Sequence, residues 1–326
     1  MALSVSLKDI KPSLDPKTKQ ILYEIWQKDA PKLMFGEHQL CVEMNAVGEF
    51  FVEKAKKELR ETPEVVAQGF KELKELLSEN PDLNVPRDVE DYLLVFLRPC
   101  KWYAKSAFSL LKRYFQYRLN YPNVYKDLTI TKDKTAICAG VIYPLPLRTF
   151  EGCRVIVVEG GKHWNPKQVS THEFFKGVIL ILFLAFLEYR TQIAGVHIIL
   201  DVGGLSLNHI TYLTPSFAKM LVDFIQKSMP TRLKGIHIVN QSRIFSIAFA
   251  IFKPFLEEKV RSRIHIHGTN WESLMAFVDK KALLQRHGGE IKMAEEQYGV
   301  TLWQNMLCCE PAFLAELQYG FKTDKQ

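Results

Sequence analysis

The sequence predicts an α/β domain, in which helices cover a mainly parallel sheet, preceded by an all-helical N-terminal domain. Up to about residue 127, apolar residues recur at intervals of three and four, as on the buried faces of helices. After about residue 135, short runs rich in Val and Ile alternate with helix-length segments, which favours parallel strands joined by helical crossovers. A chain of 326 residues that is 47% hydrophobic can bury the cores of both parts.

Capping signals and periodicity define the helices of the first part. Asp15 precedes Pro16 and Thr62 precedes Pro63, and both pairs are typical of a capped helix start. The polar stretch that begins at Tyr121-Pro122 predicts a linker. We expect helices over residues 15–26, 42–59, 62–77, 88–97 and 105–119.

In the second part, strands and helices alternate along the chain. We expect strands over residues 154–158, 196–200, 236–239 and 264–266. We expect helices over residues 170–190, 214–227, 244–256 and 271–278.

The basic residues of the chain are concentrated in one segment. The net charge is +7, and residues 226–268 hold eight Lys or Arg against two Glu, a local balance of +6. This concentration favours a localised anionic partner and does not indicate a nucleic-acid-binding protein. The six cysteines lack zinc-site spacing, which predicts reduced thiols in a cytosolic protein. The longest apolar run, residues 178–187, is half of the about 20 residues that span a bilayer, so any membrane contact is expected to be peripheral.

Residues 244–256 are apolar almost all round, and basic clusters lie on both sides. Such a helix suits a surface that meets an anionic membrane. The alternative is a buried core helix with a solvated basic rim. Periodicity alone favours this alternative.

No arrangement of residues predicts an enzyme or a metal site. The motifs GxSxG, GxGxxG and HExxH and the P-loop are absent. His265 and His267 share one face of a strand, but no third ligand is suggested nearby, so we interpret them as ordinary strand histidines. Asp201 ends a strand before two glycines, where a turn-capping role is favoured over a catalytic one. We therefore expect no cofactor and no metal.

A series of short motifs follows along the chain. The motifs are FLR at 96–98, KW at 101–102, WNPK at 164–167, DVGG at 201–204, LTP at 213–215, KGIH at 234–237, KPFL at 253–256 and RIHIHG at 263–268. Each motif is weak alone, but their order and spacing are specific, and they cover about residues 40–290. In this order they resemble the CRAL-TRIO lipid-binding family, in particular its α-tocopherol transfer protein and clavesin branch.

The resemblance implies three regions and an apolar cavity closed by a mobile helical gate. The regions are a helical N-terminal domain over residues 1–127 with a lead of about 40 residues, a CRAL-TRIO domain over 135–290 and a tail over 291–326. The implied cavity walls are Phe175, Val178, Leu182, Val196, Ile198, Leu200, Leu207, Leu213, Leu221, Phe224 and Ile225. The implied gate, at residues 240–258, carries Ile244, Phe245, Ile247, Phe249 and Phe252.

The resemblance also implies phosphoinositide binding at Arg232, Lys234, Lys259 and Arg263. Two departures from the family stand out. Val178 and Leu182 replace serines of the tocopherol-binding relative, which removes two polar groups from the cavity, and residues 284–289 lack the family's acidic and aromatic residues.

The resemblance implies a cytoplasmic protein that carries a hydrophobic small molecule between membranes, and we expect it to be a monomer. The ligand would be similar to tocopherol, a retinoid or another isoprenoid. Docking would occur on phosphoinositide-containing membranes, with endosomes among the candidates. Two alternatives remain: a phospholipid or phosphatidylinositol transfer protein, and a trafficking adaptor that binds phosphoinositide without transferring a ligand.

Overall fold

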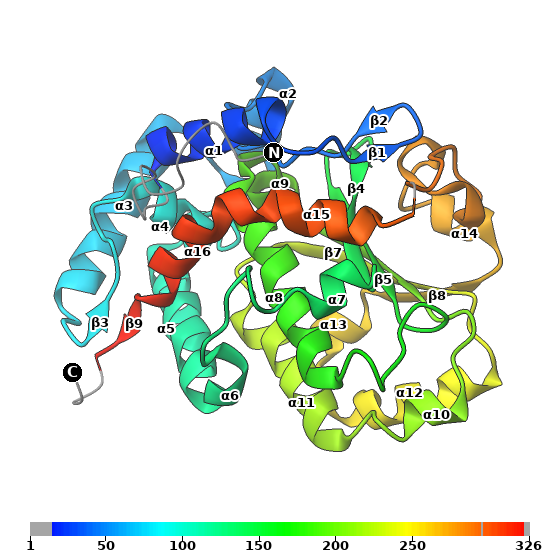
Figure 1. The fold of residues 1–326 in the computed structure, drawn as a ribbon. Helices are drawn as coiled ribbons and strands as arrows, with labels where there is room; N and C mark the ends of the chain where they lie inside the picture. Colours follow the sequence, from blue (N-terminus) through cyan, green and yellow to red (C-terminus); the bar gives the residue numbers. More distant parts are fainter. Residues whose placement is uncertain (1–14, 295, 323–326) are drawn as a thin grey trace.

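A computed structural model describes residues 15–294 and 296–322 of the chain. The first fourteen residues of the predicted lead and the last four of the predicted tail lie outside this range. At the centre is a five-stranded sheet of order β4-β5-β6-β7-β8 (Figure 1). Its strands are β4 (Ile142–Arg148), β5 (Arg154–Glu159), β6 (Val196–Asp201), β7 (Leu233–Val239) and β8 (Ile264–Gly268).

Strands β5 to β8 are parallel, which confirms the predicted α/β fold with a mainly parallel sheet. Strand β4 was not predicted and pairs antiparallel with β5. It contains Pro144 and Pro146, which lack the N–H that a central strand needs. As an edge strand, β4 tolerates both prolines, but the same residues obscure its strand pattern in the sequence.

The predicted helical domain is formed mainly by α1 (Pro16–Lys28), α2 (Glu49–Leu59), α3 (Pro63–Ser78), α4 (Glu90–Leu97) and α5 (Ala104–Asn120). Both predicted caps are present: Asp15 accepts a hydrogen bond from Thr18 N at 2.8 Å, and Thr62 caps α3. The prediction of one helix over 42–59 is wrong at its start. Val42 and Met44 are buried and alternate with less buried neighbours, so this stretch runs extended, and α2 begins only after Gly48.

The helices of the second part are α8 (Thr171–Leu187), α9 (Tyr189–Ala194), α11 (Pro215–Asp223), α12 (Arg243–Phe252), α13 (Glu258–Arg261) and α14 (Trp271–Met275). Three predicted helices are interrupted. The first breaks at Glu188, the second ends in a π-helical turn (Phe224–Ser228), and the third becomes a 3-10 turn (Lys253–Phe255) at Pro254. Pro254 cannot donate to the preceding helical turn, which explains the third break.

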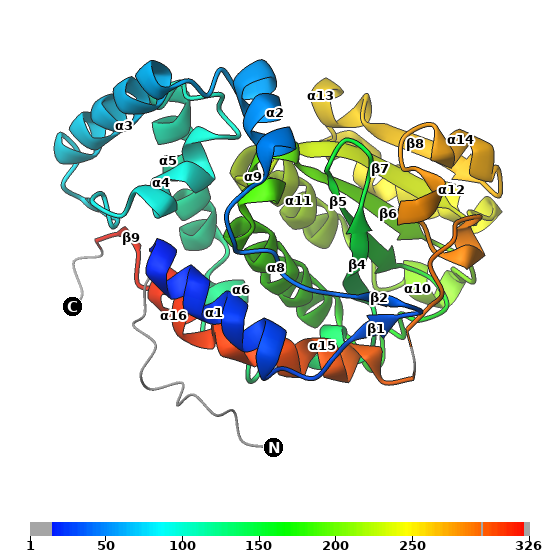
Figure 2. The same ribbon diagram turned by 90° about the horizontal axis from the view of Figure 1, so that it is seen from above.

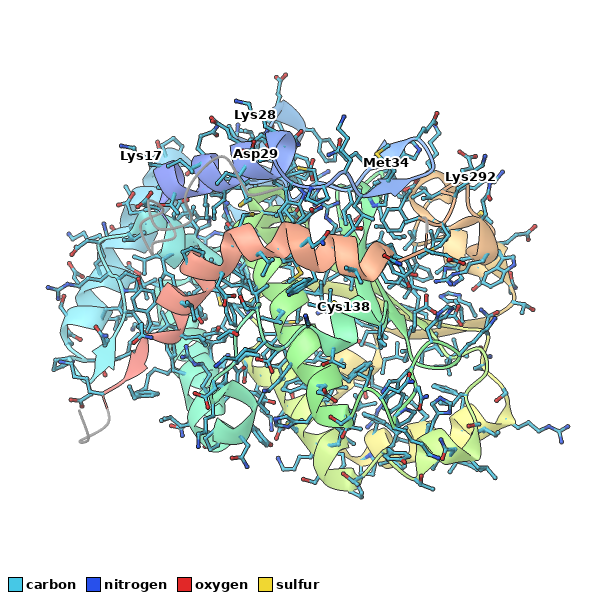
Figure 3. The ribbon with its side chains drawn as sticks, viewed as in Figure 1. Lys17, Lys28, Asp29, Met34, Cys138 and Lys292 are labelled. Carbon is cyan, nitrogen blue, oxygen red and sulfur yellow. The ribbon has the colours of Figure 1, made fainter. Side chains whose placement is uncertain are left out.

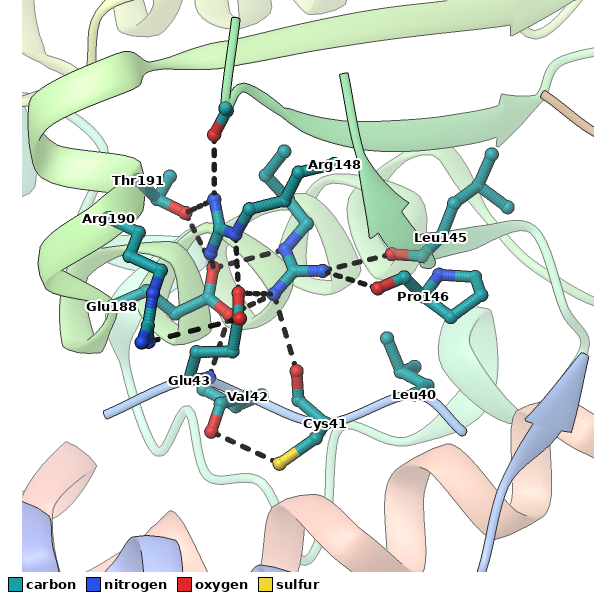
Figure 4. Close-up of polar contacts among 12 residues, drawn as sticks. Leu40, Cys41, Val42, Glu43, Leu145, Pro146, Arg148, Glu188, Arg190 and Thr191 are labelled. Carbon is teal, nitrogen blue, oxygen red and sulfur yellow. Dashed lines mark hydrogen bonds and ion pairs between the residues drawn. The ribbon is translucent and has the colours of Figure 1, made fainter. Parts of the chain in front are cut away.

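The break at Glu188 brings its carboxylate into a buried ion-pair network (Figure 4). Glu188 pairs with Arg154 of β5 and with Arg148 of β4, the latter at 2.9 Å, and Glu43 of the N-terminal segment lies 3.0 Å from Arg154. Burial acts to raise the pKa of Glu188, but the two guanidinium groups outweigh burial and hold this pKa at about 2. The network therefore fastens the extended segment before α2 to the edge of the sheet.

The C-terminal segment runs from the edge of the central sheet back to the helical domain (Figures 1 and 2). It forms α15 (Tyr298–Met306), α16 (Glu310–Leu317) and β9 (Gly320–Phe321), and β9 pairs with β3 (Leu83–Asn84). Tyr114 of α5 donates to Glu316 at 3.0 Å. The predicted tail thus packs against the helical domain.

The first helix shows how position decides the environment of a charge. Lys17 and Lys28 are exposed and point away from the molecule (Figure 3). Lys19, on the opposite face of α1, is buried 3.2 Å from Asp91. Burial is the largest influence and lowers the pKa of Lys19 to about 8, although Asp91 acts to raise it.

Candidate ligand-binding site

A cavity lies between one face of the sheet and helices α8, α11 and α12. The space inside it that the centre of a water-sized sphere can reach has a volume of about 210 Å³. Its walls are apolar side chains from these elements and the adjoining loops.

The register of the sheet builds one wall. Ile156, Ile198, Ile236 and Ile264 are paired across β5 to β8, and all four line the cavity. Val158, Leu200 and Ile238 form a second row two residues further along. Side chains two apart share a face of a strand, so these rows present a continuous aliphatic surface.

The opposite walls are helical. Phe174, Val178 and Leu182 of α8 recur at intervals of four and point to the cavity. A capping box between Ser170 and Glu173 fixes the start of this helix. Helix α11 contributes Phe217, Leu221 and Val222, and Ile225 follows from the π-helical turn.

Among the described residues that line the cavity, the one polar side-chain group is the indole N–H of Trp164. It already donates to the Val169 carbonyl at 2.8 Å. A hydroxyl group placed among these side chains would therefore lack a side-chain hydrogen-bond partner.

Seven of the eleven predicted wall residues lie around the cavity: Val178, Leu182, Ile198, Leu200, Leu213, Leu221 and Ile225. The other four lie elsewhere. Phe175 and Phe224 pack edge to face, with ring centroids 5.4 Å apart, and both contact Tyr117 of the helical domain. Val196 is fully buried at the start of β6, and Leu207 is 61% exposed in α10 (Leu207–Ile210).

Several wall residues were missed. Ile156, Ile236, Ile238 and Ile264 carry a signal that could have found them, because they alternate with residues of the other face along predicted strands. Ile142 carries no such signal, since it belongs to the unpredicted strand β4.

The predicted gate, α12, is two-sided. Phe245, Phe249 and Phe252 line the cavity, and Ala248 lies between them on the same face. Ile247 is 49% exposed, and Ile244 lies outside the cavity lining. The outer face, which meets solvent, combines the apolar Ile247 and Ala250 with Arg243 and Ser246.

The two ends of the gate are held differently. At its N-terminal end, Asn240 adopts a left-handed conformation (φ 55°) and donates to both carboxylate oxygens of Asp201 at 3.1 Å. Asp201 also accepts from Gly203 N, as predicted for a turn cap, and lies 2.9 Å from His287. Beyond the C-terminal end, the side-chain amide of Gln226 makes two hydrogen bonds to the backbone. It donates to Phe255 O at 3.1 Å and accepts from Glu257 N at 2.6 Å.

The four predicted basic residues fall into two pairs. Arg232 and Lys234 contact Glu58 of α2 at 2.8 and 3.4 Å. Lys259 is exposed and Arg263 half-buried, and neither forms an ion pair with a described residue. Figure 2 shows α2 and α13 along the same side of the molecule.

The two strand histidines belong to a larger cluster on the sheet face away from the cavity. His197 Nδ1 lies 2.9 Å from His237 Nε2, and His237 Nδ1 lies 3.0 Å from His267 Nε2. His267 ends the chain at Ser273 Oγ, 2.7 Å away. Within residues 15–294 and 296–322, no group of three or more His, Cys, Asp or Glu is arranged to hold a metal ion.

Comparison with known proteins identifies the family. Residues 140–289 match the model of the CRAL/TRIO domain. The human protein "Alpha-tocopherol transfer protein-like" is 32% identical over 242 residues, which cover 74% of this chain and 70% of that protein. Mouse "Clavesin-1" is 30% identical over 258 residues, covering 78% of this chain and 72% of that protein.

The chain belongs to the CRAL/TRIO domain family, and its relatives fall in the predicted branch. A solved structure, "Crystal structure of Sfh5", overlaps 81% of this chain and 99% of that chain at 14% identity, with a TM-score of 0.45. The family assignment follows from the sequence matches. No helix in the described part of the chain has the length and hydropathy needed to cross a bilayer.

Proposed function

We propose that the protein binds one hydrophobic small molecule in this cavity and transfers it between membranes without chemical change. A tocopherol-, retinoid- or other isoprenoid-like ligand fits the proposal. The observation that carries it is the apolar cavity closed by a helix whose inner face is apolar and whose outer face exposes Ile247. A phospholipid would need polar partners for its headgroup, and the cavity lining offers none that is free.

The gate gives the transfer cycle its dependence on membranes. Opening α12 in water would expose Phe245, Phe249 and Phe252. At about 2 kcal/mol for each side chain, exposure costs about 6 kcal/mol, so the closed state dominates in solution. A bilayer that receives these side chains removes most of that cost, so ligand exchange is confined to the membrane surface.

Docking on phosphoinositide-containing membranes is the second part of the proposal. Lys259 and Arg263 are available for headgroup contact, and each cation near an anionic surface contributes about 1 kcal/mol. The name of the relative "Alpha-tocopherol transfer protein-like" supports a carrier. We expect this carrier to be a cytoplasmic monomer that visits membranes.

The test compares wild-type protein with Leu221→Trp. It measures how much ligand each protein loads and how fast each transfers the ligand between donor and acceptor vesicles. The larger ring at Leu221 fills part of the cavity, so ligand loading should fall at least tenfold while thermal unfolding changes little. Leu207→Trp is the matched control, because Leu207 is exposed and outside the cavity. Equal loading of the two variants would show that this cavity does not hold the ligand.

A further inference from the structure

One carboxylate of the helical domain occupies the centre of the basic cluster. Glu58, in the last turn of α2, lies 2.5 Å from Lys54 Nζ, 2.8 Å from the Arg232 guanidinium and 3.4 Å from Lys234 Nζ. Arg232 is held in place by a further hydrogen bond to the Ile193 carbonyl. Three cations from two parts of the chain therefore converge on a single side chain.

The three cations strongly stabilise the charged form of Glu58. Burial acts to raise the pKa of this carboxyl, but Lys54 and Arg232 outweigh burial and hold it at about 2. Glu151 adds a second, longer contact to Lys234 at 3.8 Å. The three cations face two carboxylates, so the group keeps one surplus positive charge.

A phosphomonoester fits these cations better than a carboxylate does. It carries about 1.5 to 2 negative charges at neutral pH and three strong acceptor oxygens. Arg232 offers a planar fork for two oxygens, and each lysine offers a mobile ammonium group. The Glu58 side chain is 26% exposed, so it can swing into solvent without a buried charge being left behind.

Exposed aromatic side chains next to these cations indicate a bilayer as the source of the phosphate. Phe50 of α2 is 54% exposed, and Phe150, in the turn that carries Glu151, is 67% exposed. A Cβ at Gly152 in the same turn would lie 3.1 Å from the Phe50 ring, so Phe50 lies against this turn. Aromatic rings beside cations are typical of a surface that enters the headgroup layer of a membrane.

We propose that Lys54, Arg232 and Lys234 form one site for a phosphorylated headgroup of a bilayer lipid, which Glu58 occupies until the headgroup displaces it. This inference rests on the docking part of the proposed function and adds two residues to it. Lys54 is a headgroup ligand from the helical domain, and Glu58 is an internal competitor that weakens membrane binding.

The first test is Glu58→Gln, with binding measured by sedimentation of phosphatidylcholine vesicles that contain a phosphatidylinositol bisphosphate. Losing the competitor should tighten binding about fivefold, as expected for one charge near an anionic surface. Glu53→Gln is the matched control, since it removes the same charge one turn earlier on α2 at an exposed position. Equal effects of the two variants would overturn the role of Glu58, because only the net charge would then matter.

The second test does not depend on the stability of the Glu58 variant. Lys54→Gln should weaken binding to the same vesicles about fivefold. Lys57→Gln, at an exposed position on the same helix, should change it less than twofold. If both lysine variants bind alike, Lys54 is not a headgroup ligand. Loading of the cavity ligand should be unchanged in all four variants and serves as the folding control.

A third measurement separates the lipid from a free phosphate. Phe150→Ser should weaken vesicle binding and leave binding of a soluble inositol polyphosphate unchanged, and the soluble compound should bind more weakly than the vesicles. Tight binding of the soluble compound with no effect of Phe150→Ser would identify a site for a free phosphate and overturn the bilayer assignment.

Failure of the docking proposal has a different signature. If wild-type protein does not sediment with phosphoinositide vesicles and Arg263→Ala changes nothing, docking itself is wrong. If wild-type protein binds and Arg263→Ala weakens binding while the Glu58 and Glu53 variants are equal, only the inference about Glu58 is wrong.

Discussion

Gly235 and three histidines show how single residues shape the sheet face opposite the cavity. A Cβ at Gly235 would lie 2.6 Å from His237 Nε2 and 3.2 Å from His197 Nδ1. Glycine is therefore required where the two rings meet. Each imidazole must be neutral to both donate and accept in such a chain, and burial favours the neutral form.

These histidines predict a loss of stability in mild acid. Burial is the largest influence on both groups, and it lowers the pKa of His197 to about 4 and that of His237 to about 2. The unfolded chain, with ordinary values near 6.5, binds protons first as the pH falls. The stabilisation is complete above pH 6.5 and declines below it, by about 1.4 kcal/mol per pH unit for each histidine.

The measurement is urea unfolding at pH 7.5 and at pH 5, values chosen to lie on either side of the ordinary histidine pKa. His237→Gln should flatten the pH dependence. His163→Gln, at an exposed position, should leave it unchanged. An equally steep dependence in the His237 variant would assign the acid sensitivity to other groups.

At the scale of elements, α12 separates two tasks on its two faces. Phe249 lines the cavity, whereas Ile247 is half-exposed on the other side. Burial of an Ile side chain in the acyl boundary contributes about 1.5 to 3 kcal/mol, so Ile247→Asp should slow transfer between vesicles at least tenfold. Ligand loading in solution should remain at the wild-type level.

Phe249→Asp should behave in the opposite way. A carboxylate facing the apolar cavity would be buried without a partner, so ligand loading itself should fall. Loading is measured by extraction and mass spectrometry, and transfer by a fluorescent ligand moving between vesicles. Wild-type transfer by Ile247→Asp would exclude the outer face of α12 as the membrane contact.

At the scale of the whole molecule, a buried ion pair joins the C-terminal segment to α5 of the helical domain. Glu316 of α16 is 4% exposed and lies 3.3 Å from Arg118 of α5, and Tyr114 donates to the same carboxylate. Burial raises the pKa of Glu316, although Arg118 acts to lower it. The charged form of Glu316 is therefore stabilised by Arg118 and Tyr114 against the effect of burial.

Arg118→Ala should lower the free energy of unfolding by about 3 to 5 kcal/mol, because it leaves a buried charge without its partner. Lys112→Ala, at an exposed position of the same helix, should change it by less than about 0.5 kcal/mol. Both values follow from urea unfolding monitored by tryptophan fluorescence. A small effect of Arg118→Ala would mean that the C-terminal segment contributes little to global stability.

The sequence alone determined the properties that depend on local order. Alternating apolar strands and helices predicted the parallel sheet, and the signals at Asp15 and Thr62 predicted two helix starts. The ordered motifs predicted the family. Seven predicted wall residues lie at the cavity. Val178, Leu182 and Leu221 lie there because α8 and α11 present them on their inner faces, and Ile198 and Leu200 because they alternate along β6.

Only the tertiary structure decided which residues meet from distant parts of the chain. It added β4 with its two prolines as an edge of the sheet and turned Leu207 to solvent. It placed Glu58 on Arg232, 174 residues away in sequence, and joined His197 to His237 and His267. These contacts depend on strand register and on the packing of α2 against the sheet domain, and neither leaves a periodic signal near the residues concerned.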